Sequence, residues 1–218
     1  MHFLDAWTSL SFLDQLRLLA PAVVIGLATV LPGRRLAALL ALALAISVPA
    51  SGAIHGGWVL RAGWGLLWLT VAAVLYRAAR AGMRRPAERA GGFESTLAGL
   101  MLGAPFLALL VLAIARQNLP LAPTRAATLG TLYLSLGLIH LMVRRHVLRS
   151  ALGWGFVGVG LQVLEGATVG SVPASLAPPP GAALLATAVT IALVLRIALA
   201  RARWAGSGWL SDAHDLHD

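Results

Sequence analysis

The stretch PGRRLAALLALALAISVPASGAI, residues 32–54, decides the fold class of this chain. After two arginines it continues from Leu36 to Ile54 without a charged residue. A helix needs ~20 predominantly apolar residues to cross the hydrocarbon core of a bilayer. The stretch therefore predicts a membrane-spanning helix that begins next to a charged turn.

Further apolar runs on both sides of this stretch have the same character. Hydrophobic residues make up 59% of the 218 and charged residues only 11%, which is too little polar surface for a soluble globule of this length. The sequence therefore predicts an all-α, polytopic membrane helix bundle with about seven transmembrane helices. The seven runs are Leu16–Leu31, Leu36–Ile54, Trp58–Tyr76, Thr96–Ala115, Ala126–Val143, Val147–Leu164 and Gly181–Ala200.

The arginines between the runs indicate an orientation. With seven crossings, successive turns alternate between the two sides of a membrane, and basic turns are retained in the cytoplasm. The turns of one side hold twelve arginines and those of the other side three, so we expect the N-terminus outside and the C-terminus inside a bacterial cytoplasmic (inner) membrane. The twelve are Arg34, Arg35, Arg77, Arg80, Arg84, Arg85, Arg89, Arg144, Arg145, Arg149, Arg201 and Arg203, and the three are Arg17, Arg116 and Arg125.

The order of the runs suggests a division of the chain into parts. Residues 1–15 combine several apolar residues with Asp5 and Asp14, as in a short helix at the outer membrane surface. Residues 16–125 form a four-span half, residues 126–205 a three-span half, and residues 206–218 a cytoplasmic tail. Each half opens with a hairpin around a basic turn, so a weak repeat with a three-plus-one-plus-three plan is also predicted.

Few residues in this sequence favour chemistry. No nucleotide-binding, metalloprotease or nucleophile motif is present, and the absence of cysteine excludes disulfides and thiol nucleophiles. The arginines are spread over several turns and not gathered with aromatic residues, which disfavours nucleic-acid binding. We therefore expect no enzyme activity from the chain by itself, no cofactor and no bound metal.

One helix face is more informative. Ala151, Gly155, Gly158, Gln162 and Glu165 follow steps of four and three residues, so they share one stripe. A charged group facing lipid is costly, and the stripe should therefore face another helix or water. Gly155 and Gly158 would form a contact seam with a neighbouring subunit or span, and Gln162 with Glu165 would form part of a proton path. In the alternative interpretation Glu165 only reaches the lipid headgroups.

The other polar groups near the spans allow two interpretations each. His140 is either part of the proton path or a hydrogen-bonded contact between helices. Arg144 and Arg145 are candidate subunit contacts in a basic turn. Arg196 either pairs with a partner subunit or extends along its helix to the cytoplasmic surface.

A family resemblance is carried by LGLIHLMVRRHVLRSALG, residues 136–153. This order of apolar helix, basic turn, leucine-rich helix and glycine resembles the small three-helix subunit of complex I and the C subunit of Mrp-type antiporters. With four spans before it, the whole chain resembles the E subunit of hydrogenase-4 and formate hydrogenlyase-like complexes. The resemblance implies a non-catalytic, cofactor-free membrane-arm subunit whose partners are antiporter-like subunits, other membrane-arm subunits and the lipid bilayer.

The sequence departs from this family at the positions that matter for proton transfer. Where those subunits carry glutamates in the membrane, this chain has Gly155, Gly158 and the segment Thr187–Thr190. The resemblance therefore implies structural coupling of proton or sodium translocation more than proton transfer by this chain, with Glu165 as a displaced substitute at best. An autonomous small-solute or ion transporter is the alternative function.

Overall fold

The computed structural model of the chain describes residues 2–31, 34–80, 92–117, 119–143, 146–168 and 179–204. These residues form eight helices and, within the ranges given, no strand. The helices are α1 (His2–Thr8), α2 (Phe12–Val30), α3 (Arg34–Ala50), α4 (Trp58–Arg80), α5 (Gly92–Ala115), α6 (Leu121–Val143), α7 (Val147–Thr168) and α8 (Ala182–Trp204). The predicted all-α fold is confirmed.

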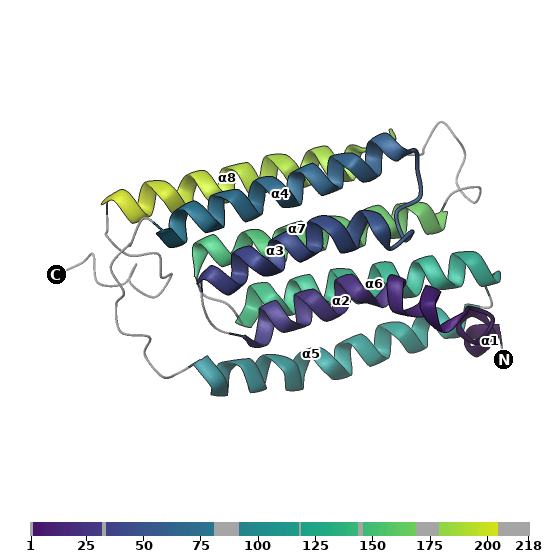
Figure 1. The fold of residues 1–218 in the computed structure, drawn as a ribbon. Coiled ribbons are helices and arrows are strands. Elements are labelled where there is room, and N and C mark those ends of the chain that lie inside the picture. The colour runs from purple at the N-terminus through teal and green to yellow at the C-terminus, as the bar shows by residue number, and fades with distance from the viewer. Residues whose placement is uncertain are drawn as a thin grey trace.

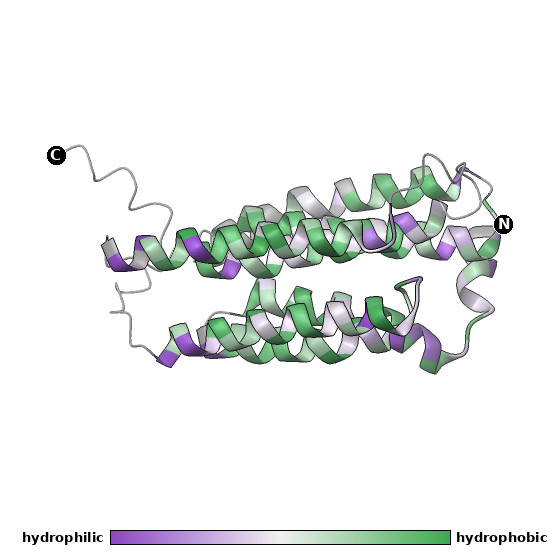
Figure 2. Ribbon diagram, turned by 90° about the horizontal axis from the view of Figure 1, so that it is seen from above, coloured by the Kyte–Doolittle hydropathy of each residue, from purple (hydrophilic) through white to green (hydrophobic). Residues whose placement is uncertain are grey.

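The long helices form two layers (Figures 1 and 2). One layer holds α2, α3 and α4, and the other holds α5, α6, α7 and α8. Within each layer, helices that follow one another in the chain run antiparallel side by side, and across the layers α2 contacts α6, α3 contacts α7 and α4 contacts α8. Helices α2–α4 thus pair with helices α6–α8 across the two layers. The remaining long helix, α5, lies at an edge next to α6.

Five helices are long and apolar enough to cross a membrane: α2, α4, α6, α7 and the first twenty residues of α8. The apolar helix α3 is shorter. Figure 2 shows hydrophobic residues along the middle of the helices and hydrophilic residues toward their ends. In the most apolar 18 residues of each span, 72% of those in α7 and 61% of those in α6 are buried inside the bundle but only 22% of those in α8, so α6 and α7 form the core and α8 lies at an edge.

The helices extend beyond the apolar runs that predict them. Ser11 caps α2, since its side chain accepts a hydrogen bond from the Asp14 backbone, and the helix begins at Phe12 although Asp14 and Gln15 interrupt its first turn. Helix α6 begins at Leu121, so the predicted boundary between residues 125 and 126 falls inside a helix. Helix boundaries depend on caps, which hydropathy does not report.

The short helix expected within residues 1–15 is α1, which packs against α6. Ala6 is buried, and Gln15 Nε2 donates hydrogen bonds to the carbonyl oxygens of Trp7 and Leu10. The N-terminal segment is therefore joined to the bundle by its own contacts.

Glycines allow α6 and α7 to approach until their backbones touch. A Cβ atom added to Gly160 would lie 2.5 Å from the backbone nitrogen of Leu134, and one added to Gly137 would lie 2.7 Å from that of Val157. Without a hydrophobic driving force in lipid, such close packing is a main source of helix association. The two helices consequently form one tightly packed hairpin through the core.

Candidate functional site

The first polar site lies where α2 ends against the first turn of α7. Arg149 is buried, and its Nη2 donates hydrogen bonds to the carbonyl oxygens of Ala28 at 2.6 Å and Leu31 at 2.8 Å. Hydrogen bonds from a charged donor are stronger than neutral ones, and a cation is favoured at the negative end of a helix dipole. Arg149 therefore caps the C-terminus of α2 from another helix.

The sequence explains why α2 needs this cap. In an α-helix the carbonyl of Ala28 would accept a hydrogen bond from the backbone nitrogen four residues later, but that residue is Pro32, which has no N–H. A buried carbonyl without a donor costs free energy. Arg149 supplies the donor that the chain of α2 itself lacks.

His140 lies in the same cluster and is fully buried. Its Nδ1 lies 2.9 Å from the hydroxyl oxygen of Thr29, and its Nε2 lies 3.2 Å from the backbone carbonyl oxygen of Arg149. The Thr29 hydroxyl is also 2.8 Å from the carbonyl oxygen of Ile25. The ring thus links α2, α6 and α7.

This geometry can satisfy two protonation states of His140. The carbonyl oxygen near Nε2 only accepts, so Nε2 carries a hydrogen. In the neutral ring, the Thr29 hydroxyl donates to Nδ1; in the charged ring, Nδ1 donates to Thr29, which then donates to Ile25. The two hydrogen-bond arrangements differ in the direction of the Thr29 hydroxyl hydrogen.

A small cavity adjoins this cluster between α3, α4 and α7. Its volume is about 10 Å³, close to the ~10–15 Å³ that one water molecule requires. His146 and Arg149 contribute the polar part of its lining, and residues of the facing helices, among them Ala37, Leu75 and Ala78, contribute the apolar part. The cavity is too small for any solute larger than water.

The second polar site lies at the opposite end of α7. Gln162 Nε2 donates a hydrogen bond of 2.8 Å to Glu165 Oε2, and Gln162 is buried while Glu165 is half-buried. These two side chains therefore lie together on one helix face, as predicted. The buried amide oxygen of Gln162 has no donor among the described residues.

The structure does not bring His140 together with Gln162 and Glu165. His140 contacts α7 at Arg149, and Gln162 lies thirteen positions further along that helix, which is about 20 Å at 1.5 Å per residue. The three members of the predicted proton path therefore divide into two sites at opposite ends of the bundle.

The predicted glycine seam faces spans of the same chain. A Cβ atom on Gly155 would meet the ring of Trp68 on α4 at 2.7 Å, and one on Gly158 would overlap the Thr187 side chain on α8. Both glycines are buried. Of the two partners expected for this seam, a subunit or a span, the contacts are with spans, and the glycines are not available to a partner subunit.

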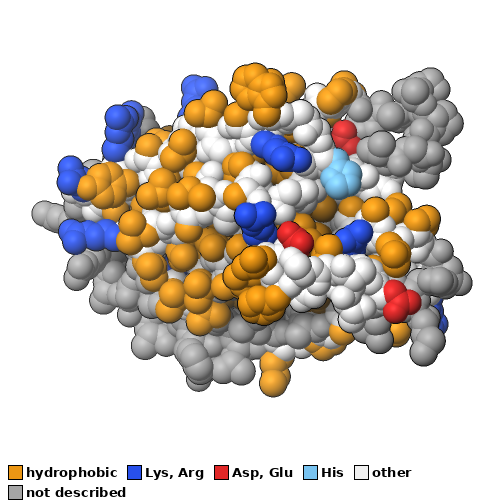
Figure 3. All heavy atoms as spheres, turned by 45° about the vertical axis from the view of Figure 1, so that its right-hand side comes forward, with side chains coloured by type: hydrophobic (Ala, Val, Ile, Leu, Met, Phe, Trp, Pro, Cys, Tyr) orange, Lys and Arg blue, Asp and Glu red, His pale blue; other side chains and the backbone are white. Residues whose placement is uncertain are grey.

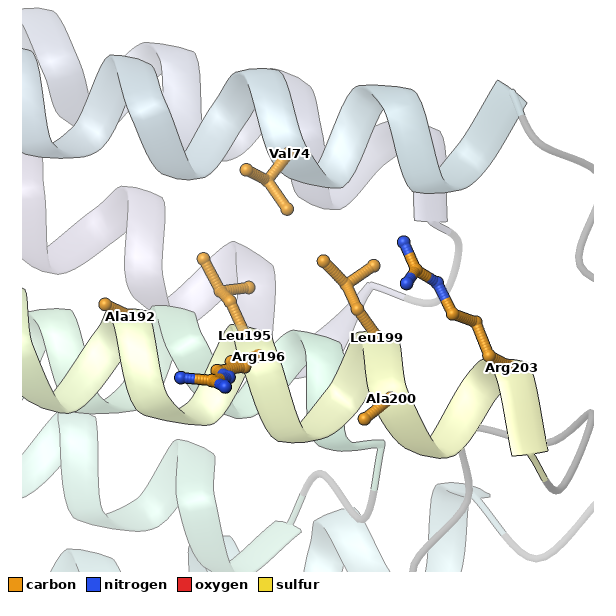
Figure 4. A pocket seen from close by; sticks show the side chains of 7 residues that line it. All are labelled: Val74, Ala192, Leu195, Arg196, Leu199, Ala200 and Arg203. Carbon is orange, nitrogen blue, oxygen red and sulfur yellow. The ribbon is translucent and has the colours of Figure 1, made fainter.

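The predicted contact arginines fall in different parts of the chain. Arg196 is exposed on α8, with exposed Leu193 and Ile197 beside it. Figure 4 shows its guanidinium directed toward Ala192, away from the end of the helix. Arg144 and Arg145 lie outside the described residues.

Sequence reasoning missed the structural role of Arg149, which it counted as a charge in a basic turn. Two signals could have found it: Val147 begins an apolar run, which places Arg149 in the first turn of a helix, and Pro32 leaves an unpaired carbonyl at the end of an earlier one. Neither signal alone says that the two helix ends meet.

These features define an all-helical bundle with five apolar helices of membrane-spanning length and two polar sites joined by α7. No protein family, curated protein or solved structure matches the chain.

Proposed function

We propose that the chain is a non-catalytic membrane-arm subunit of a complex I-like, group 4 hydrogenase-like or Mrp-like assembly. In this proposal all seven long helices cross the bacterial cytoplasmic membrane, with the N-terminus outside. The subunit contributes to the coupling of proton or sodium translocation by holding antiporter-like subunits in place.

The observation that carries the proposal is the position of Arg196. It lies five residues, about 7 Å, before Arg201, and its guanidinium is directed further into the apolar length of α8. A cation within a membrane span is costly unless another group pairs with it. A carboxylate or a carbonyl oxygen of a partner subunit would supply that group, which supports an assembly over a chain that works alone.

The α6–α7 hairpin supports a structural role. It contains residues 136–153, which carry the family resemblance, and its glycines fix the two helices against each other. The polar sites at its ends lie about 20 Å apart, and its middle is filled by side chains such as Phe156 and Tyr133, whose ring centroids are 5.1 Å apart. A rigid core of this kind is suited to hold partner subunits at fixed positions relative to one another.

Gentle solubilisation of native membranes followed by native mass spectrometry tests the proposal. We expect the chain in a complex with antiporter-like subunits, and we expect Arg196→Gln to lower the yield of that complex. Arg61→Gln is the matched control, because Arg61 is an exposed arginine in the first turn of α4.

Recovery of the wild-type chain only as a free protein would contradict the proposal. Proton or solute flux through vesicles that contain the purified chain alone would instead establish the autonomous transporter. Equal yields of the complex for Arg196→Gln and Arg61→Gln would contradict the role of Arg196 in assembly.

A further inference from the structure

A lateral groove lies between α4 and α8, and Arg196 is one of the residues that line it. Its volume is about 400 Å³. Figure 4 shows Val74 of α4 facing Leu195 and Leu199 of α8 across it, and Arg203 extending from the last turn of α8 toward α4. The groove therefore has mostly apolar walls, with Arg203 near one end and Arg196 further along α8.

The mouth of the groove is basic because α4 and α8 run in the same direction (Figure 1). The last turn of α4 contains Arg77 and Arg80, and the last turn of α8 contains Arg201 and Arg203. Arg77 lies three residues after Val74, on the same side of α4. In Figure 3, arginines gather where these two helices end, beside a mostly apolar face.

Part of this positive charge is already engaged and part is available. Arg80 stacks on Tyr76, with Cζ 4.7 Å from the ring centroid. The side chains of Arg77 and Arg203 are exposed. A ligand at the mouth would therefore meet two accessible guanidinium groups beside the apolar walls of the groove.

We propose that this groove binds an anionic phospholipid. The phosphate lies at the helix ends, where Arg203 and Arg77 donate hydrogen bonds to it, and one acyl chain lies along Val74, Leu195 and Leu199. Charge complementarity identifies the ligand: basic pockets between helices at a membrane surface bind acidic headgroups, and the apolar walls match an acyl chain. Arg196 does not bind the headgroup, because its guanidinium is directed away from the mouth.

Native mass spectrometry of the purified full chain, released from nanodiscs of phosphatidylglycerol and phosphatidylcholine, tests this site. We expect the wild type to retain phosphatidylglycerol in preference to phosphatidylcholine. Arg203→Gln should lower that retention about fivefold, the weight of one basic residue at an anionic surface, whereas Arg203→Lys should retain most of it. Ala200→Trp should lower lipid retention with the charge unchanged, because Ala200 lines the groove.

One control separates this site from general electrostatic attraction. Arg17→Gln removes an exposed arginine at the opposite end of the bundle and should leave retention unchanged. Equal retention of the two lipids, equal retention by Arg203→Gln and the wild type, or an equal loss in Arg17→Gln would overturn the proposal.

Discussion

Replacement of Gly160 by alanine should separate α6 from α7. The added Cβ would lie 2.5 Å from the backbone nitrogen of Leu134, and ordinary contact begins at 3.4 Å. Because the obstructing atoms include backbone, a rotamer change cannot relieve the clash and the helices must move apart. Overpacking of this kind costs ~1–3 kcal/mol, whereas alanine in place of glycine otherwise stabilises a helix interior by about 0.5–1 kcal/mol.

Gly26→Ala is the matched control, because a Cβ at Gly26 in α2 would meet no atom within 4 Å. The gain in helix propensity is common to both variants, so we expect them to differ in unfolding free energy by the overpacking cost of ~1–3 kcal/mol, with Gly26→Ala at or above the wild type. The unfolding midpoint in detergent, followed by tryptophan fluorescence, measures this difference. Equal midpoints for the two variants would refute the backbone contact between α6 and α7.

Three further predictions concern the polar sites and the orientation. Arg149→Gln should destabilise the fold by about 1–3 kcal/mol for each carbonyl that loses its donor, while Arg77→Gln, at an exposed position, should have little effect on the same unfolding midpoint. Glu165→Gln should lower coupled ion transport without loss of assembly if the carboxylate carries protons, and unchanged transport would leave only the headgroup interpretation. In the cysteine-free chain, Gly57→Cys should react with an impermeant external reagent and Ala87→Cys should not; the reverse labelling would invert the orientation.

Hydropathy predicted the long helices because each apolar run must be buried away from water, either in lipid or against another helix. It placed their ends poorly, since Asp14 and Gln15 look like loop residues until the Ser11 cap is seen. The spacing of Gly155 and Gly158 predicted close packing on their face of the helix but not the neighbour, because periodicity describes one helix and packing needs two. The role of Arg149 was hidden for the same reason: its hydrogen bonds join residues more than a hundred positions apart.

The pairing of α2 with α6, α3 with α7 and α4 with α8 has a consequence for how the chain is constructed. A unit of three antiparallel helices ends on the face opposite to the one on which it starts, so a second unit joined directly to it would be upside down. The single helix α5 reverses the direction once more, and both units then stand the same way up. Without α5, the arginines that end α4 and those that end α8 would lie at opposite faces. This unpaired helix is what allows one basic surface to be assembled from both halves of the chain.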